Sequence, residues 1–323
     1  MNFRTFVRVF SYSQMLPVLE SGEETLVGGQ AVVEGVMMRA PHSYCVAVRR
    51  PDGQIVTEEM AVPRMSEKYR IFKLPVFRGV GTLFQAMSLG MKALRFSAQA
   101  ALVEEGPDAK PISSWAMGAN ALLSVGFFIF MYKFIPLWLA TKLAHAYPAL
   151  SGQIALNGID GLIRMVIFIS FLLLLSRAKD IRRVFEYHGA EHKVVFNFES
   201  GKAVNVENAQ KFQTWHPRCG TSFLLVVMVL STLIYMLVPI HGFAAKMLFR
   251  VAMLPVVAGL SYELIRFAAK SPGIGMRLLT APGLWLQRIT TKPPSDDQAE
   301  VAIHALDRAM ALETQQGGEL VIA

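Results

Sequence analysis

Hydrophobic positions gather into four long runs in the C-terminal two thirds of the chain. About 20 mostly apolar residues are needed for a helix to cross the roughly 30 Å hydrocarbon core of a membrane. The run Ser222–His241 has no Asp, Glu, Lys or Arg, and the other runs are Met117–Ala140, Asn157–Ser176 and Ala244–Phe267. We therefore expect a mainly α-helical fold: a polytopic membrane bundle of about four spans within residues 115–270.

Charged residues within the runs qualify this prediction. Lys133 and Arg164 interrupt the first two runs, and we place both near span ends, where a long side chain can extend to the membrane surface. The run Asn157–Ser176 is the weakest because its apolar core, Met165–Leu175, is short.

Basic residues predict the orientation. The loop 177–220 contains eight Lys and Arg residues, whereas no Lys or Arg lies between Lys142 and Arg164. Loops rich in Lys and Arg stay in the cytoplasm. We therefore predict a multi-pass protein of the cytoplasmic membrane, with this loop and both termini inside.

Residues 79–114 are expected to form an interfacial amphipathic helix. Lys92 and Arg95 interrupt the apolar run from Gly79 to Leu102, which suits a helix lying on the membrane surface. If this segment crossed the membrane instead, the N-terminus would lie outside.

The N-terminal residues 1–78 read as a small cytoplasmic unit that contains β-structure. Ser43–Arg50 and Gln54–Met60 flank the turn signal Pro51-Asp52-Gly53 and predict a hairpin. The preceding Gly28–Pro41 reads as a glycine-punctuated strand and turn, and its glycines also permit close approach to a ligand or to another chain segment.

The C-terminal residues 271–323 are expected to form a cytoplasmic tail that contains an amphipathic docking helix. Ser295 is a suitable N-cap, and acidic residues follow in the first turn. The apolar positions then recur at helical spacing, at Val301, Ala302, Ala305, Leu306 and Met310.

Composition supports a lipid environment. Hydrophobic residues make up 53% of the 323 positions and charged residues 17%, and the mean hydropathy is +0.39, whereas a soluble domain has about 25% charged residues. The net charge of +8 suits anionic lipids or nucleic acid. Because no stripe of basic and aromatic residues is present, we expect a lipid bilayer and no nucleic acid as partner.

The cysteines and the N-terminal segment also fit a protein of the cytoplasmic membrane. The two cysteines, Cys45 and Cys219, are far apart, which argues against a disulfide framework and fits a reducing compartment. We identify no signal peptide. Small residues in the first run, Gly118, Ala119 and Ala121, are compatible with helix packing, including packing in a homo-oligomer.

The segment Tyr187–Lys193, YHGAEHK, contains the pattern H-x-x-E-H. On a helix, His188 and His192 share one face with Glu191 beside them. Two neutral imidazoles at this spacing bind Zn²⁺, and the adjacent carboxylate takes a proton from water, as in the inverted zinc-hydrolase signature. Gly189 is a poor helix former, and a solvated turn beyond the second span explains the same residues.

Two further places offer ligands. His216 and Cys219 lie three residues apart just before the third apolar run, close enough to share a metal, and a cytosolic Cys near a His is also a candidate thiolate. Glu263 lies near the end of the fourth run, where a carboxylate is costly unless it is paired or functional. It suits a third metal ligand, and pairing with Arg266 or a nearby Lys is an equally simple explanation.

Four motifs in order resemble the YqhQ-like family of bacterial membrane proteins, whose members are described as predicted metal-dependent enzymes. They are Gly28–Pro41, Tyr187–Lys193, HPRCGTSF at His216–Phe223, and LQRITTKPPSDDQAEVAIHAL at Leu286–Leu306, and the resemblance runs from about Gly28 to Met310. It implies a membrane protein with its signature residues at Glu34, Arg39, His188, Glu191, His192, His216, Arg218 and Cys219.

One hypothesis is a metal-dependent hydrolase at the cytoplasmic face. His188 and His192 would bind zinc, together with Glu263, His216 or Cys219. Glu191 would be the general base. Arg39 or Arg218 would hold an anionic group of a peptide or lipid substrate.

The alternative is a non-enzymatic scaffold, channel or assembly factor with a membrane or cytoplasmic protein partner. Any metal would then be structural. A structural site is closed by four protein ligands, whereas a catalytic site has three and an open position. The four candidates for a closed site are His188, His192, His216 and Cys219, and the sequence does not decide between the two hypotheses.

Overall fold

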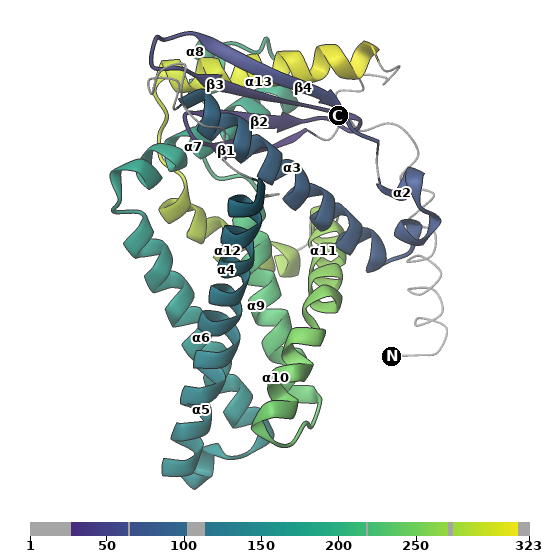
Figure 1. Cartoon of the computed structure of the whole chain (residues 1–323), viewed down its shortest axis with the longest axis vertical. Helices are drawn as coiled ribbons and strands as arrows, with labels where there is room; N and C mark the ends of the chain where they lie inside the picture. Colours follow the sequence, from purple (N-terminus) through teal and green to yellow (C-terminus); the bar gives the residue numbers. More distant parts are fainter. Residues whose placement is uncertain (1–26, 64, 102–113, 218, 271–273, 316–323) are drawn as a thin grey trace.

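The N-terminal segment, in which side chains alternate between two faces, forms a four-stranded antiparallel sheet at one end of a helical bundle (Figure 1). The computed structural model describes residues 27–63, 65–101, 114–217, 219–270 and 274–315. The strand order is β1-β2-β3-β4. The strands are β1 Gly28–Val32, β2 Gly35–Arg39, β3 Ser43–Arg49 and β4 Ile55–Ala61.

Both predicted strand segments are confirmed. β3 pairs with β4 around the Pro51-Asp52-Gly53 turn, in which Gly53 has φ +85°. The Gly28–Pro41 segment is a strand, a two-residue turn and a second strand, with Val32 opposite Gly35. Glu34 in that turn has φ +53°, in the left-handed region that few residues other than glycine adopt.

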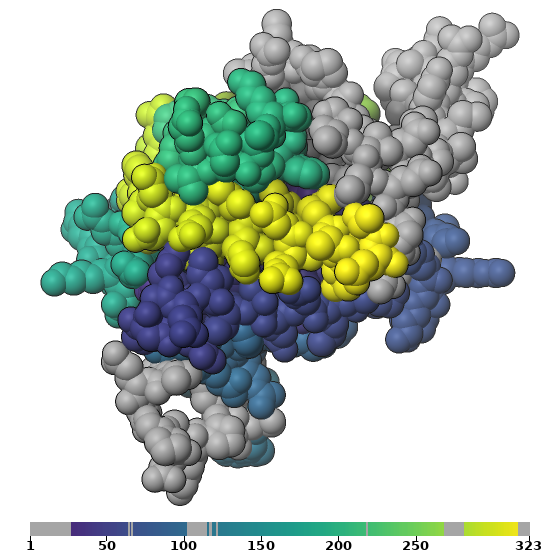
Figure 2. Space-filling view, turned by 90° about the horizontal axis from the view of Figure 1, so that it is seen from above, coloured from purple at the N-terminus to yellow at the C-terminus, as the bar shows by residue number. Residues whose placement is uncertain are grey.

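The sheet is buried on both faces because its alternating side chains meet a helix on each side. Val36, Met38, Cys45 and Ala47 pack with α7 (Lys179–Glu199) and α13 (Asp296–Gln315). The other face, with Tyr44 and Val46, packs on Leu89 and Ala93 of α3 (Phe77–Ala101). Seen from the sheet end, α13 runs between the strands and the α7–α8 region (Figure 2); α8 is Val206–Gln210.

The tail helix begins with a capping box. The Ser295 hydroxyl accepts from the Gln298 backbone N–H at 3.3 Å, and the Ser295 N–H donates to Gln298 Oε1 at 2.9 Å. This reciprocal pair satisfies two backbone donors at the helix start. The predicted apolar positions Val301, Ala302, Ala305 and Leu306 are all buried against the sheet and α7.

Within the described residues, three helices of the bundle are long and apolar enough to cross a membrane, and a bent pair makes a fourth candidate. The first, Gly118–Ala146, joins α4 (Ser114–Ile129), the π-helical η4 (Phe130–Phe134) and α5 (Ile135–Ala146). The next two are α6 (Gln153–Leu175) and α9 (Gly220–Leu237). The pair α10 (Phe243–Ala252) and α11 (Leu254–Lys270) bends by 49°.

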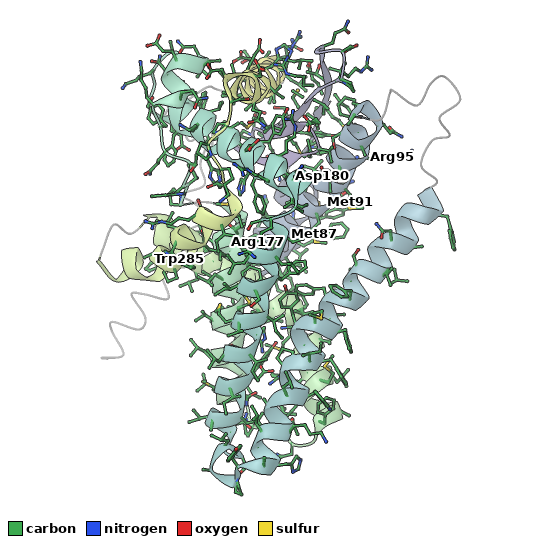
Figure 3. All side chains as sticks on the ribbon, turned by 90° about the vertical axis from the view of Figure 1, so that its left-hand side faces the viewer. Met87, Met91, Arg95, Arg177, Asp180 and Trp285 are labelled. Atoms are coloured by element: carbon green, nitrogen blue, oxygen red, sulfur yellow. The ribbon has the colours of Figure 1, made fainter. Side chains whose placement is uncertain are left out.

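The sides of this bundle are apolar and exposed. Leu122, Leu162 and Leu174 are 74%, 65% and 70% exposed, which is compatible with lipid contact. At the level where the bundle meets the sheet-bearing unit, Figure 3 shows Met87 of α3 near the height of Arg177 and Trp285, with Met91 and Arg95 successively farther up α3.

The expectation that Lys133 and Arg164 reach the membrane surface is wrong. Arg164 lies midway along α6 and is 1% exposed; it pairs with Asp160 and donates to Ser231 at 2.7 Å. Lys133 is 4% exposed and donates to the Tyr235 hydroxyl at 3.2 Å. Both charges stay inside because neighbouring helices supply partners. The run containing Arg164 is also not weak, since α6 is continuous over 23 residues.

One long helix was not predicted: α12 (Ile274–Thr290), which contains Pro282 and packs against α9. The shorter helices are α2 (Met65–Lys68), η2 (Arg70–Lys73) and η5 (Pro148–Leu150).

Substituting Asp160→Asn is expected to destabilise the bundle strongly. Asp160 is fully buried and accepts from Arg250 at 2.6 Å as well as from Arg164. Removing one partner of a buried ion pair costs about 3–5 kcal/mol, which lowers the Tm by roughly 5 °C or more. Thermal unfolding in one detergent measures it. Glu207→Gln, which breaks the exposed Glu207–Lys211 pair, is the control and should leave the Tm unchanged; equal Tm values for both variants would contradict the prediction.

Candidate metal centre

Helix α7 carries His188, Glu191 and His192 on one face, as the i, i+3, i+4 spacing predicts. The two imidazole rings lie 4.4 Å apart between centroids. The side chains of His188 and Glu191 are 15% and 8% exposed, and His192 is 2% exposed. The segment is therefore a buried helix and not a solvated turn.

Backbone carbonyl groups fix the orientation of both imidazoles. His188 Nδ1 lies 2.8 Å from the carbonyl oxygen of Thr290, and His192 Nδ1 lies 2.5 Å from that of Thr214. A carbonyl oxygen only accepts, so each Nδ1 carries the proton and donates it. Each Nε2 is left with a lone pair, which is the state that binds a metal.

Gly189 makes the contact between His188 and the Thr290 carbonyl possible. A Cβ atom at this position would lie 2.0 Å from the backbone oxygen of Lys292. The Lys292 N–H also donates to the Phe185 carbonyl at 2.9 Å. The segment 290–294, which begins at the last residue of α12, therefore runs directly against α7, and only glycine fits between them.

Cys219, the N-cap residue of α9, supplies a third donor atom. Its Sγ lies 3.2 Å from His188 Nε2 and 3.2 Å from Thr221 Oγ1. The ligand atoms of His188, His192 and Cys219 all lie within 4.8 Å of one another. Tetrahedral zinc with bonds of about 2.0–2.3 Å holds its ligand atoms roughly 3.3–3.6 Å apart. The three ligand atoms therefore fit zinc if the side chains move together by about 1 Å.

Glu191 lies beside this group and is held by the sheet. Its Oε2 is 4.0 Å from His188 Nε2, and its carboxylate accepts the backbone N–H of Gly29. Burial raises the pKa of Glu191, while the neighbouring imidazoles of His188 and His216 and the Gly29 N–H act in the opposite direction. A Cβ on Gly29 would lie 2.7 Å from Glu191 Cγ. This glycine thus brings β1 close to another chain segment.

His216 lies next to the group but is not part of it. Its ring centroid is 5.7 Å from that of His192, and its Nε2 pairs with Glu199 at 3.4 Å. Gln287 of α12 holds its backbone, accepting the His216 N–H at 2.7 Å and donating to the His216 carbonyl at 2.8 Å. Gln287 therefore positions the segment before α9, in which His216 lies.

The remaining candidates lie elsewhere or outside the described residues. Glu263 accepts from Arg78 Nε at 2.7 Å and from the Val76 N–H at 3.2 Å. It does not belong to the histidine and cysteine group, and it forms an ion pair with Arg78. Arg39 donates to Gln85 of α3 at 2.6 Å. Arg218 lies outside the described residues.

Sequence reasoning missed Thr214 and Thr290, whose backbone carbonyls orient the imidazoles, and Gln287, whose side-chain amide holds the backbone of His216. Backbone carbonyls leave no signature in residue type. The one available signal was the motif around Thr290, LQRITTKPPSDD, which we assigned to the tail and not to the site.

Substituting Gly189→Ala is expected to destabilise the protein by about 1–3 kcal/mol, because the new methyl group forces the segment 290–294 away from α7. Denaturant unfolding in detergent measures the loss. The matched control is Gly126→Ala in α4, where no atom lies within 4 Å of the added Cβ and alanine is neutral or slightly stabilising. A Gly189→Ala protein as stable as wild type would show that this close approach is not required.

Comparisons with known proteins agree with the sequence resemblance. The family model described as "Protein of unknown function (DUF1385)" matches residues 74–312. The chain is 35% identical over 297 residues to the uncharacterized protein YqhQ of Bacillus subtilis (strain 168), covering 88% of this chain and 92% of the relative. No solved structure matches the chain.

Proposed function

The chain belongs to the DUF1385 family of proteins of unknown function, and from the geometry of its own site we propose that it is a metal-dependent hydrolase. His188, His192 and Cys219 would hold Zn²⁺. The observation that carries the proposal is the convergence of two Nε2 lone pairs and one thiol within 4.8 Å, from two separate elements.

The number of donors favours a catalytic site over a structural one. A catalytic zinc has three protein ligands and an open position, whereas a structural zinc is closed by four. His216, the fourth member of the competing closed set, pairs with Glu199 and lies outside the group. This arrangement favours the hydrolase over a scaffold with a structural metal.

Glu191 is suited to be the general base. A bound Zn²⁺ would polarise the scissile group and increase the acidity of a water molecule. The Glu191 carboxylate would accept a proton from the attacking water and return it to the leaving group, so that it is unchanged after each turnover. Burial raises its pKa, which brings a carboxylate closer to the pH at which a base works best. The Gly29 N–H keeps it oriented.

The substrate class remains a peptide or a lipid headgroup in this proposal. Arg218 would hold an anionic group of that substrate, and Arg39 is left out because its guanidinium donates to Gln85 of α3, away from the histidine and cysteine group. We assign no catalytic part to Glu263, because its carboxylate is engaged by Arg78 and by the backbone of Val76.

We further propose that the sheet-bearing unit and the site face the cytoplasm, on a bundle of three or four spans in the cytoplasmic membrane. The eight basic residues of 177–220 support this orientation. So does α3, which exposes Phe84, Met87 and Met91; Met87 lies close to the level of Arg177, just beyond the end of α6 (Figure 3), and such apolar side chains suit the membrane surface.

Elemental mass spectrometry of detergent-purified protein tests the metal site. We expect about one zinc per chain in the wild type and loss of zinc in His188→Ala, His192→Ala and Cys219→Ser, because each substitution removes a ligand. Zinc should persist in Glu191→Gln, which keeps all three ligands but loses the base, and in His216→Ala. The matched control is His145→Ala on α5, an exposed histidine outside the group.

Thiol alkylation gives a second readout that does not depend on activity. Cys219 should be protected by zinc and become reactive after chelation. Cys45 should stay unreactive in both states, because it is fully buried and burial raises its pKa to about 12. The metal proposal fails if folded protein purified without chelators contains no transition metal, or if the three ligand variants retain it. If zinc is found, a screen of hydrolase substrates follows. Activity supports the proposal only if the Glu191→Gln substitution abolishes it.

Reporter fusions test the orientation in a bacterial host. Alkaline phosphatase, which is active only outside the cytoplasm, should be active when fused after Ser151, between α5 and α6. It should be inactive when fused after Gln210, while a C-terminal green fluorescent protein should fluoresce. The reverse pattern would place the site on the outer side.

A further inference from the structure

A second polar cluster lies inside the bundle, remote from the metal centre. Asp160 of α6 accepts from Arg250 of α10 at 2.6 Å and from Arg164. Arg250 also donates to Asn157 at 2.7 Å. Lys133 joins the cluster through the Tyr235 hydroxyl at 3.2 Å. All five of these charged or amide side chains are at most 4% exposed.

The cluster has more positive than negative charge. Three cations, Lys133, Arg164 and Arg250, surround the single carboxylate of Asp160. The sequence supplies no other Asp or Glu between residues 114 and 178, and none between 220 and 262. Unbalanced charge among apolar helices is costly unless something compensates it, so the cluster has the electrostatic character of an anion site.

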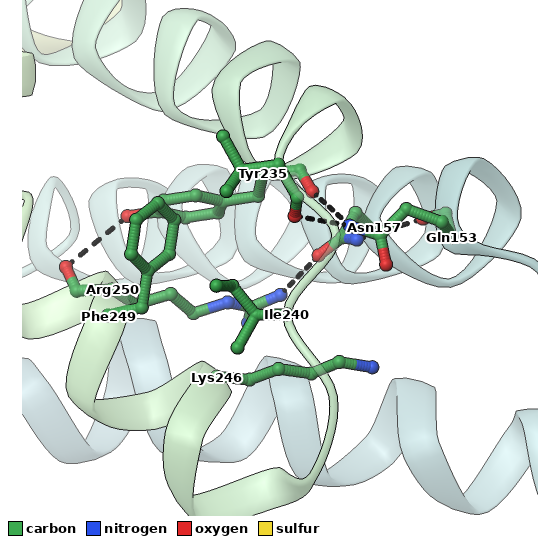
Figure 4. A pocket seen from close by; sticks show the side chains of 8 residues that line it. Gln153, Asn157, Tyr235, Ile240, Lys246, Phe249 and Arg250 are labelled. Atoms are coloured by element: carbon green, nitrogen blue, oxygen red, sulfur yellow. Dashed lines mark hydrogen bonds between the residues drawn. The ribbon is translucent and has the colours of Figure 1, made fainter.

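A small cavity connects the cluster to the end of the bundle. It has a volume of about 10 Å³, enough for about one water molecule, and it lies between α6, the segment Val238–Ile240 and α10 (Figure 4). Lys246 and Arg250, four residues apart on α10, line it together with Asn157 and Gln153.

The amide N–H groups of the lining are already used, whereas Arg250 is used only in part: one N–H of each terminal nitrogen donates, to Asp160 and to Asn157, and the guanidinium has five N–H groups in all. Gln153 Nε2 donates to the carbonyls of Tyr235 and Val238, both at 2.7 Å, and Asn157 Nδ2 donates to the Gln153 carbonyl at 2.8 Å. The half-buried Lys246 makes no ion pair with a described acidic residue. The donors that remain for a ligand are therefore the Lys246 ammonium and Arg250 N–H groups.

The cavity lies near the end of the spans that is opposite the sheet. Asp160 is seven residues from the start of α6 at Gln153, or about 10 Å along the helix. Val238 and Ile240 belong to the connection between α9 and α10, at the foot of the bundle (Figure 1). In a membrane, phospholipid headgroups lie at this level.

We propose that this end of the bundle binds a phosphate-type oxyanion at the cavity mouth, with one oxygen in the cavity, held by Lys246 and Arg250. The cavity admits one oxygen but not a whole phosphate, so the rest of the anion stays at the membrane surface. The phosphate comes either from a phospholipid headgroup or from the solvent. This site is independent of the proposed hydrolase site.

Native mass spectrometry and titration calorimetry test the proposal on the full-length protein. Lys246→Gln removes one ligand-binding charge without touching the buried ion pairs. Lys142→Gln, an exposed lysine on α5, is the charge-matched control. The first arm measures retention of phosphatidylglycerol against phosphatidylcholine after detergent exchange, and the second measures binding of inorganic phosphate to delipidated protein. Equal Tm values for the three proteins confirm that all are folded.

Lys246→Gln should weaken binding about tenfold or more, the effect of losing one charge-assisted hydrogen bond, and Lys142→Gln should not. Selective loss of phosphatidylglycerol identifies a lipid phosphate, and selective loss of inorganic phosphate binding identifies a soluble one. Absence of saturable binding in both arms overturns the proposal. An equal effect of both lysine substitutions also overturns it, because it would indicate only general surface attraction.

Discussion

The candidate site depends on two hydrogen bonds from imidazole rings to backbone carbonyl groups. His188 donates to Thr290 and His192 to Thr214. The two carbonyls lie on segments that themselves meet, since the Thr291 hydroxyl contacts that of Thr214 at 3.3 Å. Gln287 adds the backbone of His216 to the same assembly. One helix is thereby joined to the segment after α12 and to the segment before α9, and both Nε2 atoms face Cys219. Gly189 is required because any side chain there would separate these parts.

The two polar regions of the molecule handle burial differently. At the candidate metal centre the buried groups are imidazoles, a thiol and one carboxylate, each with a neighbour that fixes its orientation. In the bundle the buried groups carry full charges, and the cations outnumber the single Asp160. The first arrangement suits a ligand that replaces weak donors, namely a cation. The second suits a ligand that supplies missing negative charge. The same chain therefore offers sites of opposite preference at its two ends.

Sequence reasoning predicted those features that depend on local pattern. The apolar runs, the Pro51-Asp52-Gly53 hairpin, the capped tail helix and the shared face of His188, Glu191 and His192 follow from periodicity and turn chemistry. Sequence reasoning did not predict the features that depend on contacts with residues far away in the sequence. Arg164 was assigned to the membrane surface because two of the residues that hold it inside lie on other helices: Ser231 on α9 accepts from it, and Arg250 on α10 shares its partner Asp160. Gly189 counted against a helix, although it permits the contact with Lys292. Helix α12 was missed, because Pro282 interrupts its apolar pattern.

The cover of the sheet by α13 has a consequence for biosynthesis. The strands are complete at Ala61, but the helix that buries one face of β2 and β3 begins at Asp296. At translation rates of 5–20 residues per second, the intervening chain takes roughly 10–50 s to synthesise. During this interval the side chains of Val36, Met38 and Ala47 lack their final neighbours while the apolar helices emerge from the ribosome. A nascent chain of this kind needs a chaperone or the membrane surface to shield that face until translation ends.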